Sequence, residues 1–294
     1  MNRKHQQTLV ISLAALVVFV GTRADIHAQT RVSVGVTETI ETHNPYGDSV
    51  SLLYGIWSEI TGPFCTYNYA KGDFEGRLAE RWKVENPTTW VFYLNKNYKF
   101  NDGSAVTADD VVHSLMTRVV KDPQSKQKAS VAPSVVNAET VDKFTVRVTT
   151  DKPTAPLLSF MCDRLIVTSK AVFDKYGREA ADKEHMMGGG PYRLKELIPG
   201  QRLVIAKRPD HPDAKKNPRA PDEVVYLVMR ETEQRVTALL NDEVQIAQFI
   251  PPHLRQRVEK IPNLKITPVD SVEIMFLAMQ PKPPFDKKEV RQAV

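Results

Sequence analysis

Alternating apolar and polar residues predict β-strands in several segments of the chain. Residues 31–36 (RVSVGV) alternate in this way, and residues 88–100 (TTWVFYLNKNYKF) alternate around Trp90 and Phe92. These segments predict a first strand and then two or three antiparallel strands. Residues 224–229 (VVYLVM) are apolar without a charged interruption, which predicts a strand buried on both faces.

Helical spacing of apolar residues occurs between these strands. The pattern recurs in residues 49–60 (SVSLLYGIWSEI), 109–120 (DDVVHSLMTRVV) and 231–243 (ETEQRVTALLNDE). Residues 244–250 (VQIAQFI) then predict another strand. The order strand, helix, strand between residues 223 and 250 is typical of an α/β sheet.

The N-terminal segment has a different pattern, that of a secretory signal. Two basic residues precede an uncharged apolar run, residues 8–21, and small residues follow at Ala24 and Ala28. We predict a signal peptide over residues 1–28, with cleavage after Ala28 and Ala24 as the second choice. The run is shorter than the about 20 residues that span a bilayer. An uncleaved membrane anchor is the alternative.

Composition and charge limit the class of protein. The chain has 294 residues, 41% of them hydrophobic, which allows one large or two ordinary domains with a substantial core. Its formal net charge is +5, and loss of Arg3, Lys4, Arg23 and Asp25 with the signal peptide lowers it to +3. Because the remaining basic residues are scattered instead of forming a stripe, nucleic acid is not an expected partner.

Cysteine, histidine and serine spacing argues against a metal centre or a hydrolase. Cys65 and Cys162 are too far apart in the sequence to form a metal-binding pair, and no histidine falls in an HExxH spacing. No serine lies in a G-x-S-x-G motif. We therefore predict no catalytic residue, no metal and no cofactor. In an oxidising compartment the two cysteines could pair, but two free thiols fit the sequence equally well.

Residues 100–115 (FNDGSAVTADDVVHSL) gather acidic and amide side chains around a glycine. A calcium-binding loop is disfavoured because apolar residues stand where oxygen ligands should continue. The segment instead predicts a turn at Asp102–Gly103 and a helix that Thr107 caps together with Asp110. Asp109 and Asp110 lie in the first turn, where the helix dipole favours negative charge. Adjacent residues on a helix do not face one another, which argues against an acid pair in an exported hydrolase.

The same stretch belongs to a longer resemblance. Residues 78–115 resemble, in order and spacing, the signature of the family 5 extracellular solute-binding proteins, the peptide- and nickel-binding group of ABC importers. Four later blocks resemble further segments of that family: GGGPYRLKELIPG (188–200), KRPDHPDAKKNPRAPDEVVY (207–226), ALLNDEVQIA (238–247) and PPFDKKEVRQAV (283–294). The resemblance extends from about residue 31 to the end of the sequence.

The sequence departs from the family pattern at several positions. Gly189 stands where threonine is usual, and Gln245 replaces an aspartate. In residues 207–226 the usual Asn-Pro and aromatic residue are altered. Asp242 replaces a glycine, and aspartate can adopt the left-handed conformation of such a turn, at some cost.

The resemblance implies an α/β fold of the periplasmic-binding-protein-like type II, cluster C-like. Members of the family have two lobes that close on a ligand, and a satellite domain is inserted in the first lobe. Residues 31–60 plus 163–280 would form the core of the first lobe, residues 61–162 the satellite domain, and residues 281–294 the start of a truncated second lobe. The rest of the second lobe, which supplies much of the ligand cleft, would then be missing from this sequence.

The resemblance also implies a binding protein, not an enzyme. The protein would be the periplasmic substrate-binding component of an ABC importer. It would capture a solute, in the first place an oligo- or dipeptide, and deliver it to permease subunits in the inner membrane. It would act as a monomer. A truncated copy that binds nothing and an exported hydrolase are the alternatives.

Candidate ligand contacts follow from the family's plan. The loop after the first strand would face the cleft, with aromatic side chains as walls; the candidates are Glu38, Thr39, His43 and Asn44 in the loop and Trp57 and Tyr67 as walls. For two of them the sequence offers a structural alternative. Trp57 also fits a core position, and His43 also fits a surface loop.

Overall fold

The computed structural model describes residues 30–38, 41, 43–47, 51–262, 264–267 and 279–293. The predicted signal peptide and the candidate residue Thr39 lie outside these ranges. The chain divides into two compact units. The first unit contains Thr42–Ile198, Leu203–Val225 and the residues before Ser33, and the second contains Ser33–Glu41, Pro199–Arg202 and Tyr226–Val294. The division into core and satellite domain stays a prediction.

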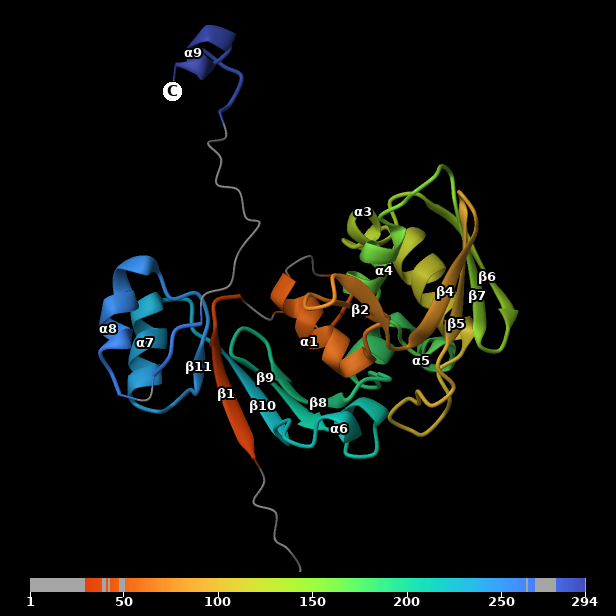
Figure 1. Cartoon of the computed structure of the whole chain (residues 1–294), viewed down its shortest axis with the longest axis horizontal. Coiled ribbons are helices and arrows are strands. Elements are labelled where there is room, and N and C mark those ends of the chain that lie inside the picture. The colour runs from red at the N-terminus through yellow and green to blue at the C-terminus, as the bar shows by residue number, and fades with distance from the viewer. Residues whose placement is uncertain are drawn as a thin grey trace, which may run out of the picture. The chain divides into compact units, whose positions relative to one another are not determined.

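The predicted order strand, helix, strand between residues 223 and 250 is confirmed. It consists of β10 (Glu223–Val228), α7 (Thr232–Leu240) and β11 (Ile246–Ala247). The two strands belong to a five-stranded sheet of order β11-β1-β10-β9-β8 (Figure 1), in which the other members are β1 (Arg31–Val36), β8 (Tyr192–Ile198) and β9 (Arg202–Lys207). β1 and β11 run parallel, with Val34 opposite Ile246.

A second sheet, antiparallel and of order β4-β5-β7-β6, lies in the first unit. Its strands are β4 (Ala79–Asn86), β5 (Thr89–Leu94), β7 (Thr145–Thr150) and β6 (Val135–Asp142). β5 is the strand predicted around Trp90 and Phe92. Phe92 is buried and pairs with Trp82 on one side and Val146 on the other, while Trp90 is only half-buried.

The helices complete both units. α1 (Ser51–Thr61) confirms the helix predicted in residues 49–60, because Leu53, Ile56 and Ile60 are buried along one side. The other described elements are β2 (Cys65–Asn68), β3 (Asp73–Gly76), α3 (Lys128–Val131), α4 (Leu157–Arg164), α5 (Lys170–Lys183), α6 (Pro212–Lys216), η2 (Pro252–Leu254), α8 (Arg255–Glu259) and α9 (Lys288–Gln292). None of the helices in the described ranges is both long and apolar enough to cross a bilayer.

The helix predicted in residues 109–120 begins at the predicted cap. α2 (Ala108–Val112) continues directly into a π-helix, η1 (His113–Val120). The Asp110 carboxylate accepts hydrogen bonds from the backbone N–H and the hydroxyl of Thr107, at 2.9 and 2.7 Å. It also accepts one from the backbone N–H of Lys170 at 2.9 Å. The Asp109 carboxylate accepts one from the Thr140 hydroxyl at 2.6 Å, so both acids have structural partners.

Replacing Thr107 with alanine is expected to lower the free energy of unfolding by about 1 kcal/mol, because the N-terminus of α2 loses its cap. Urea denaturation measures the change. Thr237 is exposed in the middle of α7 and serves as the control. Its replacement by alanine should not destabilise the protein, since alanine is the better helix former. Equal losses in the two variants would contradict the cap.

The second unit is organised around a buried arginine on α7. The Arg235 side chain, 2% exposed, donates hydrogen bonds to the backbone carbonyls of Met229 (2.7 Å), Arg230 (2.8 Å), Gln248 (3.0 Å) and Phe249 (3.1 Å). These bonds fix the ends of β10 and β11 against the helix. Just beyond α7, Asp242 has φ 59°, the left-handed conformation expected where the family has glycine.

Candidate functional site

Glu38 follows the carboxyl end of β1, the end of the strands at which open α/β sheets commonly bind ligands. Its side chain is half-buried and accepts a hydrogen bond from the Thr37 hydroxyl at 2.8 Å. The adjacent strand β11 leads to Phe249, whose side chain is 61% exposed. This end of the second unit therefore offers a carboxylate and an aromatic ring.

His43 and Asn44 lie in the first unit, in a tight turn. The Asn44 Oδ1 atom accepts a hydrogen bond from the backbone N–H of Tyr46 at 3.0 Å, and its backbone carbonyl accepts one from Gly47 at 3.1 Å. His43 is half-buried, and burial together with the charge of Lys183 lowers its pKa. The Asn44 side chain thus holds the turn, and contact of either residue with a ligand stays a prediction.

The two aromatic candidates have different surroundings. Trp57 is 1% exposed and packs in the core, as its helical apolar position allows, and contact with a ligand stays a prediction. Tyr67 lines a pocket of about 490 Å³. Of the candidates that the structure describes, only Tyr67 lies at this pocket.

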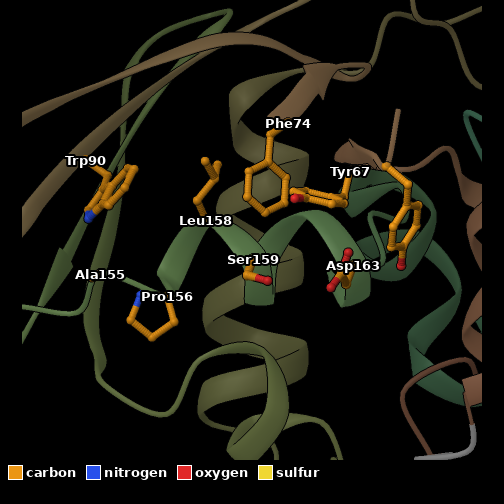
Figure 2. Close-up of a pocket in the computed structure, with 9 residues that line it drawn as sticks. Tyr67, Phe74, Trp90, Ala155, Pro156, Leu158, Ser159 and Asp163 are labelled. Atoms are coloured by element: carbon orange, nitrogen blue, oxygen red, sulfur yellow. The ribbon is translucent and has the colours of Figure 1, made fainter. Parts of the chain in front are cut away.

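The pocket is bounded by the hairpin of β2 and β3, by α4 and by the exposed side of β5 (Figure 2). On the hairpin, Tyr67 is directly opposite Phe74, and their ring centroids are 5.1 Å apart. The Tyr69 ring lies 5.1 Å from that of Tyr67. Trp90 of β5 closes the far side. Three rings from the hairpin and one from the sheet therefore line one cavity.

The α4 side of the pocket is more polar. Ser159 and Asp163 are one helical turn apart and both line the cavity, as do Pro156 and Leu158. Burial raises the pKa of Asp163, and the neighbouring Arg164 only partly opposes this shift. The Asp163 carboxylate, which remains exposed to solvent, thus lies beside the aromatic rings.

A disulfide between Cys65 and Cys162 joins the hairpin to α4. Their Cα atoms lie 4.4 Å apart across a sequence separation of 97 residues. Of the two alternatives that the sequence left open, paired and free thiols, the structure has the pair. Cys65 and Tyr67 share one face of β2, and Asp163 directly follows Cys162, so the bond holds the two walls of the pocket together.

Most residues of this pocket were not predicted from the sequence. Tyr69, Phe74, Trp90 and Asp163 were not candidates, since nothing local distinguishes them from surface or strand residues. The cysteines carried the usable signal. A pair between them would have placed Tyr67, two residues beyond one cysteine, beside the acid that follows the other.

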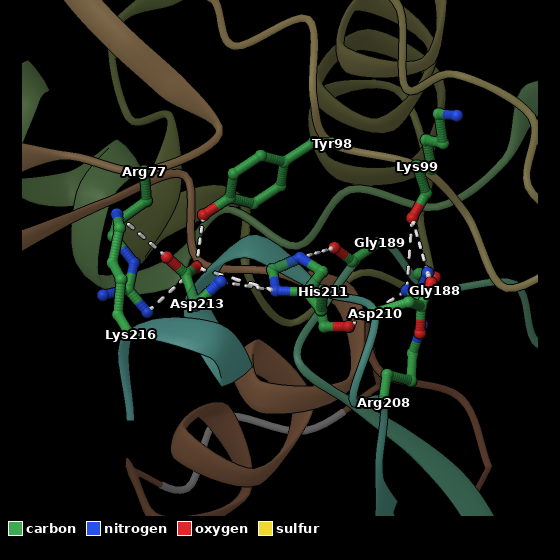
Figure 3. Close-up of polar contacts among 11 residues, drawn as sticks. Arg77, Tyr98, Lys99, Gly188, Gly189, Arg208, Asp210, His211, Asp213 and Lys216 are labelled. Carbon is green, nitrogen blue, oxygen red and sulfur yellow. Dashed lines mark hydrogen bonds and ion pairs between the residues drawn. The ribbon is translucent and has the colours of Figure 1, made fainter. Parts of the chain in front are cut away.

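A buried polar cluster lies elsewhere in the first unit (Figure 3). The Asp213 carboxylate accepts a hydrogen bond from the Tyr98 hydroxyl and forms ion pairs with Arg77 at 3.2 Å and Lys216 at 3.4 Å. Burial alone would raise the pKa of Asp213, but these partners and His211 outweigh burial and lower it. The cluster keeps the Asp213 carboxylate charged at the start of α6.

His211 connects this cluster to residues 188–190, the three-glycine segment. Its Nδ1 atom accepts a hydrogen bond from the backbone N–H of Asp213 at 3.2 Å, so the Nε2–H donates to the Gly189 carbonyl at 2.9 Å. This pattern fits a neutral imidazole. Because all of these bonds are internal and the side chain is buried, we assign His211 a structural role.

Arg208 fixes the same segment from the other side. Its guanidinium donates hydrogen bonds to the carbonyls of Gly190 (3.0 Å), Lys99 (3.1 Å), Phe100 (3.2 Å) and Gly188 (3.5 Å). Arg208 is itself buried, and burial lowers its pKa. The arginine therefore fastens residues 188–190 to the turn before α2.

Acidification is expected to destabilise the protein as pH falls through about 6.5, the ordinary histidine pKa. Burial lowers the pKa of His211, His43 and His113 in the folded state. The unfolded chain then binds more protons than the folded one just below 6.5, so stability present above that pH is lost on acidification. Urea denaturation from pH 7.5 to 5.5 measures this slope. His211→Gln should have a shallower slope, and an unchanged slope would remove His211 from the explanation.

Within the described ranges, no three histidine, cysteine, aspartate or glutamate side chains are grouped closely enough to hold a metal ion. The aromatic pocket and the polar cluster around Asp213 differ in character. In the polar cluster the Asp213 carboxylate is paired with Arg77, Tyr98 and Lys216, whereas the pocket of Figure 2 is open and lined by rings and a carboxylate.

Comparison with known proteins reports on the chain as a whole. A family model described as bacterial extracellular solute-binding proteins, family 5 Middle, matches residues 73–294. The probable D,D-dipeptide-binding periplasmic protein of Escherichia coli is 28% identical over 228 residues, which cover 76% of this chain and 43% of that protein. The periplasmic murein peptide-binding protein of the same species is 23% identical over 241 residues, covering 76% and 44%.

Solved structures share the fold. The binding protein MoaA of A. tumefaciens in complex with mannopinic acid has a TM-score of 0.76 and 25% identity, covering 90% of this chain and 55% of that one. OppA of Burkholderia pseudomallei has a TM-score of 0.71 and 21% identity, covering 80% and 49%. The predicted α/β binding-protein fold is therefore confirmed, and this chain spans about half the length of the proteins it matches. The chain belongs to the bacterial extracellular solute-binding proteins of family 5.

Proposed function

We propose that this chain is part of the substrate-binding component of an ABC importer that captures a short peptide. The family match over residues 73–294 is the observation that supports this most. The relatives named above are a D,D-dipeptide-binding and a murein peptide-binding protein. Since the chain spans less than half of their length, peptide capture and delivery to permease subunits are proposals for the complete protein.

The periplasm is the proposed location. Three observations support it: the signal-like order of residues 1–28, the periplasmic names of the relatives, and the disulfide between Cys65 and Cys162. Disulfides persist in oxidising compartments such as the periplasm and are rare in the cytosol. A thiol count on the protein isolated from its native host tests this, because a cytosolic protein would have two reactive thiols.

Binding is proposed to occur at the carboxyl end of β1. An extended peptide would be held by backbone hydrogen bonds, as in strand addition, while the lobes close around it by hinge motion. The Glu38 carboxylate is suited to the peptide's terminal ammonium group, and Thr39, His43 and Asn44 are the further candidates. The hydrolase alternative is disfavoured because Asp109 and Asp110 already accept hydrogen bonds from Thr140 and Thr107.

Isothermal titration of this chain with dialanine, its D,D-isomer, a tripeptide and mannopinic acid tests the proposal. A saturable signal with a peptide is expected, and Glu38→Gln should weaken it about tenfold, equivalent to about 1.4 kcal/mol. Glu233→Gln, an exposed position on α7, is the matched control. If no peptide binds this chain, the non-binding fragment is the correct reading. Peptide cleavage that is lost in Asp109→Asn would support the hydrolase.

A further inference from the structure

We propose that the aromatic–acid pocket, lined by Tyr67, Tyr69, Phe74, Trp90 and Asp163, binds an organic cation, an ammonium or guanidinium group on an apolar body. Nothing in the proposed peptide capture requires this pocket. It lies entirely within the first unit, and of its residues only Tyr67 was a candidate for the ligand cleft.

The lining of the pocket suits an apolar body. Its volume of about 490 Å³ falls within the usual range for small-molecule sites, roughly 300–1,000 Å³. The Tyr69 side chain is 89% exposed, so a large ring at the edge of the cavity has no covering group in the described structure. Aromatic faces also attract cations through the ring quadrupole.

The charge of the pocket selects a cation. Asp163 is the one charged side chain among its lining residues, and its carboxylate makes no hydrogen bond or ion pair with another described residue. The adjacent Arg164 instead places its guanidinium over the Tyr54 ring, 4.8 Å from the centroid. A cation that enters the pocket would supply the partner that the carboxylate lacks.

The walls of the pocket are preorganised. Cross-strand pairing sets Tyr67 against Phe74, and the disulfide fixes the hairpin to α4 on the helical turn that carries Asp163. Rigid walls reduce the entropy lost on binding. The carboxylate and the rings are thus held together before any ligand arrives.

Titration with 2-phenylethylammonium and with its neutral counterpart 2-phenylethanol tests the proposal. Backbone N–H signals of Tyr69 and Asp163 and the indole N–H signal of Trp90 are followed by NMR. The cation should shift them saturably and bind about tenfold more tightly than the alcohol. Asp163→Asn should abolish that preference, whereas Asp151→Asn, which removes the same charge at an exposed position outside the pocket, should leave it unchanged.

Each other outcome is informative. Equal affinity for cation and alcohol, or a preference that survives in Asp163→Asn, would reduce the pocket to an adsorbing aromatic surface and overturn the proposal. If glucose bound saturably and the cation did not bind, the proposal would be overturned in favour of a carbohydrate site. Tyr69→Ala removes an exposed ring, so it should weaken binding of the cation without unfolding the protein. Glu38→Gln should not affect it, which separates this proposal from peptide capture.

Discussion

Replacing both Cys65 and Cys162 with serine is expected to lower the free energy of unfolding by about 4 kcal/mol. The disulfide closes a loop across 97 residues, and in the chain-entropy model a cross-link over roughly 100 residues is worth at most about 4.7 kcal/mol, of which measured disulfides often deliver less. The bond also holds a two-stranded hairpin, which is marginal alone, against α4. Urea denaturation of the double variant and of the oxidised wild type measures the difference.

The control for this experiment is the wild type itself under reducing conditions. Its stability should match that of the double variant, because both lack only the cross-link. A difference below about 1 kcal/mol between oxidised and reduced wild type would mean that packing alone holds the hairpin in place. The same samples report on the pocket, since cation binding should weaken when its walls are no longer joined.

Replacing Gly190 with alanine is expected to cause the second large loss of folding stability. A Cβ atom there would lie 2.2 Å from the Glu59 carbonyl oxygen, and one at Gly188 would lie 2.1 Å from that of Ile60. These neighbours are backbone atoms, which cannot rotate away as a side chain could, so the end of α1 must move away from residues 188–190. We expect Gly190→Ala to cost about 3 kcal/mol, the upper part of the range for overpacking. Thermal and urea denaturation measure it.

Gly55 supplies the matched control. It lies in α1, and a Cβ atom there would have no neighbouring atom within 4 Å. Gly55→Ala should therefore stabilise the helix by up to about 1 kcal/mol. The two substitutions add the same group with opposite expected signs. If Gly190→Ala were as stable as the wild type, the close approach of the two segments would be wrong.

Local patterns predicted the elements well, because burial of a strand face or a helix stripe leaves a periodic mark in the sequence. Phe92 is an example, and the cap at Thr107 followed from residue types three positions apart. The π-helix after Val112 left no such mark, since residues of both helix types can bury the same side chains. The left-handed Asp242 was anticipated only through the family's glycine.

The candidate site was predicted less completely, for a physical reason. The pocket joins Tyr67 and Phe74 to Asp163, and the contact depends on how the chain folds back over about ninety residues. Neither periodicity nor local motifs indicate which residues so far apart in the sequence come into contact. Trp57 illustrates the reverse case, because its helical spacing fitted a buried residue and the family's plan alone had suggested a cleft wall.

The position of β1 has a consequence for the order of folding. This early strand lies between β10 and β11, and the hydrogen bond from the Ser33 N–H to the Gln245 side chain spans 212 residues. The bond from the Thr30 N–H to the Asp222 side chain spans 192. Contacts so distant in sequence form late and slowly. A growing chain must therefore keep one edge of β1 unpaired until β10 has been made, and the other edge until β11 has been made, and both edges are open to wrong partners meanwhile.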